Sequence, residues 1–180
     1  MLGKPTSLVC LFLVGLVAGQ TCHELPDTGV EFGTAILVAR GTSEPNAAGG
    51  KFGIVVGDPV VSNTTAKLPG ARGYPVQYPA SSSIISGTRQ GAADVVARLK
   101  AQAAACPNQL FSLVGYSQGA SVMHSAASDI PVSLYPAKQV CASGDPTCDN
   151  NGDCTYYHLT YIRPEYIDPA VDFIVKGFKG

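Results

Sequence analysis

The chain has 180 residues, of which 46% are hydrophobic, and its formal net charge is −1. Its 12 lysines and arginines are scattered along the chain, so the charge pattern argues against a nucleic-acid partner. A chain of this length suits one domain with a sizeable core, and we expect a monomer.

The N-terminus has the pattern of a secretory signal. Lys4 supplies a positive charge, residues 8–18 are almost wholly apolar, and small residues end the stretch. The apolar stretch is too short to span a bilayer, and no second candidate follows it, so we expect no membrane segment. The sequence therefore predicts a signal peptide over residues 1–19, an extracellular location, and a single domain over residues 20–180.

Secretion favours disulfides among the cysteines that remain after Cys10 leaves with the signal. These are Cys22, Cys106, Cys141, Cys148 and Cys154. Five is an odd number, which leaves one unpaired, and the spacing matches no zinc-ligand pattern. Asn63 begins an Asn-Thr-Thr sequon, so we expect a glycosylation acceptor on a surface loop.

The first part of the chain predicts strands and one long helix. Residues 35–39 form a continuous apolar run, as expected of a strand buried on both faces. Residues 52–61 favour neither strand nor helix. Residues 74–79 contain two prolines and predict an edge strand. A helix follows to Ala105, capped by Ser86 or Thr88. Its apolar positions recur at helical spacing and should face the sheet: Ala92, Val95, Val96, Leu99 and Ala103.

The centre of the chain contains the motif Gly-x-Ser-x-Gly. The apolar run 111–114 predicts a strand, Ser117 stands between two glycines, and residues 120–129 predict a helix. Strand, turn and helix in this order are the context of a nucleophile elbow. A sharp turn would hold Ser117 in a strained conformation and direct the next N–H group, that of Gln118, at a developing oxyanion.

The last third of the chain predicts a short strand at 138–143 and a final helix. Asp168 should cap this helix with Pro169 at its first position. Its buried stripe would be Val171, Ile174, Val175 and Phe178. Strands that alternate with helices predict a three-layer α/β domain around a mostly parallel sheet.

A serine nucleophile needs a base and an acid that orients the base. His23 lies beside a cysteine in the N-terminal segment, and His124 lies two turns along the helix after Ser117, too far to reach back. His158 is then the candidate base, in a loop after the last short strand. Such loops lie at the carboxyl ends of strands, where functional groups of α/β sheets gather.

The acid has three candidates in one loop. Asp145 directly follows the predicted strand 138–143, whereas Asp149 and Asp153 lie further along. We favour Asp145 because Cys141 and Cys148 flank it at a distance that a disulfide can close. The order Ser, Asp, His is that of α/β-hydrolases.

Taken together, these motifs resemble the secreted fungal cutinases and their relatives, which include acetylxylan esterases. The resemblance rests on residues 115–119, 141–148 and His158, and it extends to residues 39–44 and 106–107. It thus covers nearly the whole mature chain and implies the three-layer α/β-hydrolase fold of that family.

The resemblance also implies roles for individual residues. Ser117 would be the nucleophile, Asp145 the acid and His158 the base, while Thr42 and Gln118 would form the oxyanion hole. Cys22 would pair with Cys106 and Cys141 with Cys148, which leaves Cys154 unpaired. The implied activity is hydrolysis of carboxylic esters, without cofactor or metal, on cutin-type polyesters, short acyl esters or acetylated xylan.

One departure from the family concerns chain length. Ser117 and Asp145 are only 28 positions apart, where family members carry a further core strand. Either the fold is compacted around a working triad, with the acid's strand directly beside that of the nucleophile, or a segment is missing. We favour the second reading, a sheet one core strand short. A cutinase-like protein without catalysis is therefore the alternative to an active esterase.

Overall fold

The computed structural model describes residues 34–45, 52–106, 109–130 and 137–179. Residues 1–19, Cys22 and His23 lie outside this part of the chain, so the predictions for them stay predictions. In chain order the elements are β1 (Thr34–Ala39), α1 (Gly57–Lys67), β2 (Arg72–Pro75), α2 (Ile84–Ala105), β3 (Leu110–Gly115), α3 (Gln118–Ser128), the 3₁₀-helix η1 (Thr155–Ile162) and α4 (Pro164–Lys179).

Among the described residues, three parallel strands form the sheet, in the order β2-β1-β3. The central strand β1 is apolar and buried on both faces, as the sequence predicts. The strand predicted at 74–79 is β2 at 72–75, and it lies at an edge of the sheet as expected. All three strands end at the same edge, because parallel strands run in one direction.

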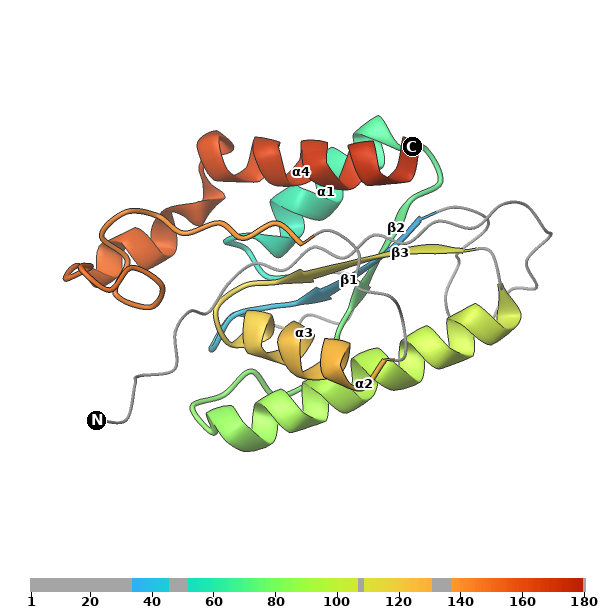
Figure 1. Ribbon diagram of the computed structural model, residues 1–180, viewed down its shortest axis with the longest axis horizontal. Coiled ribbons are helices and arrows are strands. Elements are labelled where there is room, and N and C mark those ends of the chain that lie inside the picture. The colour runs from blue at the N-terminus through green and yellow to red at the C-terminus, as the bar shows by residue number, and fades with distance from the viewer. Residues whose placement is uncertain (1–33, 46–51, 107–108, 131–136, 180) are drawn as a thin grey trace.

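Helices cover both faces of this sheet, with α2 and α3 on one side and α1 and α4 on the other (Figure 1). Alternate residues of β1 point into the two layers: Leu37 packs with Val95 and Met123, whereas Ile36 packs with Val60 and Ile174. The prediction of a three-layer α/β domain around a parallel sheet is confirmed.

Helix α2 begins earlier than the sequence predicts. Ser83 precedes its first residue, so Ser86 and Thr88 lie inside the helix and cap nothing. Of the predicted buried stripe, Ala92 and Val95 are buried as expected. Ala103 is exposed, whereas the neighbouring Gln102 is buried, so the buried face of the last turns includes residue 102 and not residue 103.

Helix α1 resolves the ambiguous segment of the sequence. It runs from Gly57 to Lys67 and places Val60 and Val61 in the core. Asn63 is exposed on this helix and not on the expected loop. The hydroxyl of Thr64 in the same sequon is buried without a hydrogen-bond partner among the described residues.

Helix α4 begins at Pro164, four residues before the predicted cap. Asp168 therefore caps nothing, and Pro169 lies inside the helix. A proline suits the first position of a helix, and Pro164 meets that preference first in the chain. The predicted stripe is correct: Val171 and Ile174 are buried, with the remaining two positions packed against the same cluster.

The strand predicted at 138–143 does not form. Residues 137–143 have no regular secondary structure, and no strand follows β3 within the described ranges. The acid's segment is thus not a strand beside that of the nucleophile. One physical reason is that the Ala142 N–H donates to the hydroxyl of Tyr161 at 2.9 Å instead of to a neighbouring strand. The buried Ala142 side chain still anchors the segment to the core.

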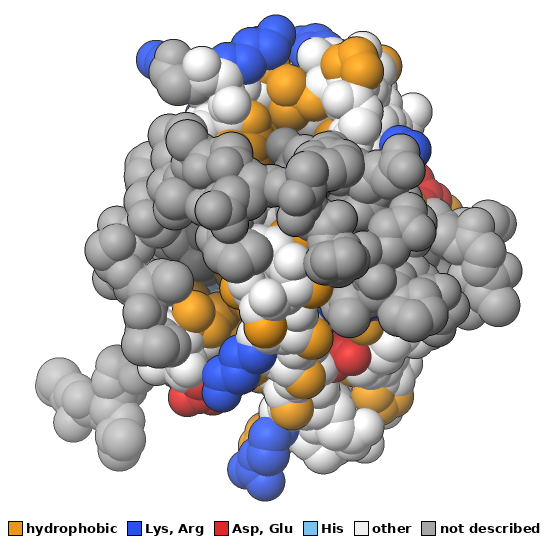
Figure 2. All heavy atoms as spheres, turned by 90° about the vertical axis from the view of Figure 1, so that its right-hand side faces the viewer, with side chains coloured by type: hydrophobic (Ala, Val, Ile, Leu, Met, Phe, Trp, Pro, Cys, Tyr) orange, Lys and Arg blue, Asp and Glu red, His pale blue; other side chains and the backbone are white. Residues whose placement is uncertain are grey.

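Figure 2 views the end of the molecule that lies to the right in Figure 1, away from η1. On this face lysine and arginine side chains lie in separate groups at the top and bottom of the view, without merging into one patch. The scattered basic residues of the sequence are therefore scattered on this face as well.

Candidate active site

The ends of β1 and β3 define one edge of the sheet. Ala39 pairs with Gly115 at the last position of the two strands. Thr42 follows three residues after Ala39, and Ser117 follows two residues after Gly115. The parallel register therefore brings the two hydroxyl groups to the same edge.

Ser117 occupies a sharp turn between β3 and α3. Its backbone has φ 55° and ψ −120°, a region that residues with a side chain rarely adopt. Close packing explains the glycines on either side of it. A Cβ atom at Gly115 would lie 2.4 Å from the Gly119 carbonyl oxygen, and one at Gly119 would lie 1.9 Å from the Ala39 carbonyl oxygen. The predicted elbow, with its strained serine and small neighbours, is confirmed.

His158 lies on η1, where the sequence suggested a loop. This 3₁₀-helix lies beyond the end of the sheet, next to the loop that carries Asp145 (Figure 1). Tyr116 packs against the imidazole, with 5.1 Å between ring centroids and 25° between ring planes. The Tyr116 hydroxyl also donates to the His158 carbonyl at 2.5 Å. The residue before the serine thus holds both the ring and the backbone of the histidine.

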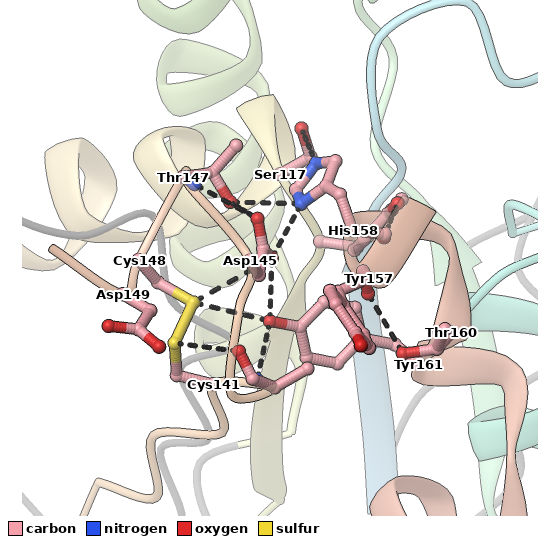
Figure 3. A network of polar contacts seen from close by, with 12 residues as sticks. Ser117, Cys141, Asp145, Thr147, Cys148, Asp149, Tyr157, His158, Thr160 and Tyr161 are labelled. Atoms are coloured by element: carbon pink, nitrogen blue, oxygen red, sulfur yellow. Dashed lines mark hydrogen bonds and ion pairs between the residues drawn. A yellow bond between two sulfur atoms is a disulfide. The ribbon is translucent and has the colours of Figure 1, made fainter. Parts of the chain in front are cut away.

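A continuous chain of hydrogen bonds joins the three predicted triad residues (Figure 3). His158 Nδ1 lies 2.9 Å from Asp145 Oδ2, and Nε2 lies 3.0 Å from Ser117 Oγ. The carboxylate can only accept, so Nδ1 carries the proton and Nε2 accepts from the serine hydroxyl. Side-chain exposure falls from 15% for His158 to 0% for Asp145. The arrangement can take a proton from the serine.

Asp145 is held by donors to both carboxylate oxygens. The backbone N–H and the hydroxyl of Thr147 donate to Oδ1, at 2.9 and 2.7 Å. His158 and the Tyr161 hydroxyl donate to Oδ2. Burial raises the pKa of Asp145, but the hydrogen bonds from Thr147, His158 and Tyr161 together lower the pKa below its usual value. The acid is thus held ionised.

The rival candidates lie elsewhere. Asp149 accepts from the backbone N–H groups of Gly144 and Asn151, so it stabilises the loop, and Asp153 is exposed. His124 is exposed on α3, as the sequence predicts.

Thr42 and Gln118 meet beside the serine. The Thr42 hydroxyl donates to Gln118 Oε1 at 3.0 Å, and Gln118 Nε2 donates to the Ile84 carbonyl at 3.4 Å. The backbone N–H groups of Thr42 and Gln118 make no hydrogen bond within the described part of the chain. Two backbone N–H groups without a partner among the described residues therefore lie near Ser117.

A disulfide closes the loop that carries the acid. Cys141 and Cys148 are bonded as the resemblance implied, with seven residues of separation. Cys106 is also in a disulfide, while Cys22, its expected partner, lies outside the described residues. Cys154 is free and exposed.

Sequence reasoning missed three residues that hold the acid and base: Tyr116, Thr147 and Tyr161. Thr147 follows Asp145 by two, the spacing at which Asp side chains commonly accept from the backbone. Tyr161 follows His158 by three, which is one turn of a 3₁₀-helix. Both spacings can be read from the sequence, but they predict a contact only once the turn and the 3₁₀-helix are known.

Two further findings concern the described residues alone. They contain no group of three or more His, Cys, Asp and Glu side chains that could hold a metal ion. None of their helices combines the length and the apolar character needed to cross a membrane.

Comparisons with known proteins find similar sequences. A family model described as Cutinase matches residues 32–138. A cutinase of Trichoderma harzianum is 33% identical over 168 residues, which cover 77% of this chain and 64% of that relative. The chain thus spans less than two thirds of that relative's length.

Solved structures are similar as well. A Trichoderma reesei cutinase in complex with a phosphonate inhibitor aligns with a TM-score of 0.66 at 31% identity, covering 81% of this chain and 76% of the other. An acetylxylan esterase aligns with a TM-score of 0.62 at 22% identity, covering 81% of this chain and 98% of the other, which is a likeness of fold alone.

Proposed function

Because this chain belongs to the cutinase family, we propose that it is a serine esterase that hydrolyses carboxylic ester bonds through a covalent acyl-enzyme. One observation carries the proposal: the unbroken hydrogen-bond chain from Ser117 Oγ through His158 to Asp145. An inactive relative would have no need to keep all three side chains within hydrogen-bond reach.

The proposed reaction has two halves. Ser117 Oγ attacks the ester carbonyl while His158 Nε2 takes its proton, and a tetrahedral oxyanion forms. His158 then protonates the leaving alcohol, and the acyl group stays on the serine. Water, deprotonated by the same nitrogen, attacks the acyl-enzyme, and His158 then returns the proton to Ser117 Oγ as the carboxylic acid leaves. Asp145 keeps Nδ1 protonated throughout, so that Nε2 faces the serine.

Thr42 and Gln118 are the proposed oxyanion hole. The Gln118 N–H stands at the first position of α3, where the helix dipole also favours negative charge. The Thr42 hydroxyl donates to Gln118 Oε1 in the free protein, and it would turn to the substrate oxygen as charge develops. Donors of this kind are worth about 2.7–4 kcal/mol of transition-state stabilisation each.

The surroundings of the serine favour an apolar ester as substrate. Ile84 and Ile85 begin α2 beside Gln118 and are 44% and 78% exposed. On the other side Leu159, next to His158 in the sequence, is 58% exposed. Exposed aliphatic side chains suit an acyl chain or a cutin-type polyester. The alternative, acetylated xylan, has only the likeness of fold in its support.

We also propose that the protein is secreted, with residues 1–19 as its signal, residues 20–180 as one domain and Asn63 as a glycosylation acceptor. The Cys141–Cys148 disulfide supports an oxidising compartment. The exposure of Asn63 on α1 is compatible with a glycan.

The test replaces the nucleophile in the full chain. We expect Ser117→Ala to abolish hydrolysis of a short-chain p-nitrophenyl ester. Ser121→Ala, the same change one turn along α3, should keep parental activity. An organophosphonate should label the parent and Ser121→Ala at Ser117 and leave Ser117→Ala unlabelled. Undiminished hydrolysis by Ser117→Ala would refute the assignment.

A parent protein that neither hydrolyses the ester nor reacts with the phosphonate would favour the alternative, a cutinase-like protein without catalysis. Adding acetylated xylan as a second substrate decides between the two ester classes.

A further inference from the structure

Tyr161 lies on the same face of η1 as His158. The two residues are three apart on a 3₁₀-helix, and side chains at this spacing eclipse one another. Both reach the loop that carries Asp145, as Figure 3 shows. One turn of helix therefore presents an imidazole and a phenol to a single carboxylate.

The Tyr161 hydroxyl has a defined direction. It accepts from the Ala142 N–H at 2.9 Å, and a backbone N–H can only donate. Its own proton therefore goes to Asp145 Oδ2, 2.8 Å away, which is the oxygen that accepts from His158 Nδ1. The hydroxyl thus links the backbone of Ala142 to the carboxylate of Asp145.

The ring of Tyr161 is fixed by packing. The side chain is 5% exposed, and its ring centroid lies 5.9 Å from that of Tyr116 and 5.2 Å from that of Tyr166. A buried ring in an aromatic cluster cannot swing away from the carboxylate without opening the core. The hydrogen bond to Asp145 is therefore preorganised.

Within the described ranges, no strand supports the segment that carries Asp145. Residues 137–143 form no regular secondary structure, so no hydrogen bonds to a neighbouring strand hold the backbone that leads to Asp145. We propose that Tyr161 is a positioning residue, whose phenol fixes the carboxylate of Asp145 in the plane that the imidazole of His158 requires. This inference rests on the proposed esterase function, and it assigns to Tyr161 the support that a strand would otherwise give.

The proposal is tested with Tyr161→Phe, which keeps the ring and removes the hydroxyl. We expect kcat for a short-chain p-nitrophenyl ester to fall about tenfold, the change that corresponds to one lost hydrogen bond to a charged group. We expect KM to stay within about twofold, because Tyr161 is buried and its hydroxyl is directed at Asp145 and not at the serine. Tyr166→Phe is the matched control, since Tyr166 belongs to the same aromatic cluster and donates nothing to Asp145.

A double-mutant cycle separates positioning from general stability. In an Asp145→Ala background the phenol has no carboxylate to hold, so Tyr161→Phe should change the residual rate less than about twofold. A purely structural role would lower the rate by the same factor in both backgrounds. The carboxyl resonance of Asp145, followed by NMR against pH, should titrate at higher pH in Tyr161→Phe than in the parent and in Tyr166→Phe.

The outcomes are distinguishable. A parent that hydrolyses the ester, with Tyr161→Phe equally active, overturns the role of Tyr161 alone. Equal losses with and without Asp145 overturn it too, as does an unchanged titration of Asp145. A parent without esterase activity overturns the proposed function and this role with it. If Tyr161→Phe unfolds at the assay temperature, the NMR titration at lower temperature still decides.

Discussion

The proposed nucleophile, Ser117, and the proposed acid–base pair, Asp145 and His158, are held in place by different means. The elbow around Ser117 lies between β3 and α3, and its geometry follows from backbone packed on backbone. The acid–base segment, residues 137–162, lies beyond the sheet and contains only the short helix η1. Its geometry follows from a disulfide and from side-chain hydrogen bonds.

Because of this difference, mutations in the two regions should have different effects. At the elbow a single added methyl group collides with backbone atoms that cannot move aside. In the acid–base segment the polar side chains around Asp145 each have a particular partner, so their truncation removes contacts without creating collisions. We therefore expect elbow mutations to affect folding first, and acid–base mutations to affect turnover first.

The largest effect is expected at Gly119. Its replacement by alanine would place a Cβ atom 1.9 Å from the Ala39 carbonyl oxygen and 2.7 Å from the Arg40 carbonyl oxygen. Both oxygens belong to the backbone, which cannot move aside in a close-packed layer. We expect Gly119→Ala to lower the free energy of unfolding by about 3 kcal/mol or more. Urea denaturation measures this loss. Ser121→Ala, on the same helix, should change stability little. A Gly119→Ala protein of parental stability would contradict the view that backbone packing fixes the elbow.

A smaller effect is expected from removing the Cys141–Cys148 disulfide. Chain entropy predicts a loss of about 2 kcal/mol for a closed loop of this size. Asp145 lies inside that loop, so kcat should fall in the double variant Cys141→Ser/Cys148→Ser even where the protein stays folded. The double variant and the protein it is compared with should both carry Cys154→Ser. This change removes the free thiol and so prevents thiol–disulfide exchange. Parental kcat in the folded double variant would show that hydrogen bonds alone hold the acid.

The smallest effect concerns the pH dependence of stability. The pKa of Asp145 is lower in the folded protein than the value of about 3.9 expected when unfolded. A lowered folded pKa stabilises the protein above the unfolded pKa, and this stabilisation is lost as pH falls through the folded pKa. The free energy of unfolding should therefore decrease below about pH 4. Asp145→Asn should show a shallower decrease in urea titrations at a series of acidic pH values. An identical slope in both proteins would mean that Asp145 contributes nothing to acid sensitivity.

The same comparison explains which features could be predicted from the sequence. The elbow is local: strand, glycine, serine, glycine and helix are consecutive, so the motif alone predicts its geometry. Asp145 and His158 could be selected by elimination and by the resemblance to a family, but the residues that hold them in contact could not. The loop between them has no periodic pattern, and its partners Thr147 and Tyr161 become visible only when the turn and η1 are known.

Two errors have specific physical causes. Residues 138–143 are apolar enough for a strand, but the Ala142 N–H is taken by a side-chain hydroxyl. Pro169 has the residue type of a helix start, but α4 begins at another proline earlier in the chain. In both cases the residues favour the predicted element, but another residue of the chain determined the structure: Tyr161 in the first case and Pro164 in the second. The short interval after Ser117 was expected to disturb the site, yet the acid reaches the histidine without a strand of its own.

The three-residue turn of η1 makes the length of this segment as important as its composition. Each residue advances the helix by about 120°, so one inserted residue between His158 and Tyr161 would rotate the phenol by a third of a turn. The phenol would then point away from the carboxylate while the imidazole kept its place. This stretch can thus vary in its outward-facing residues, such as Leu159, but it cannot gain or lose a residue without separating the acid from its support.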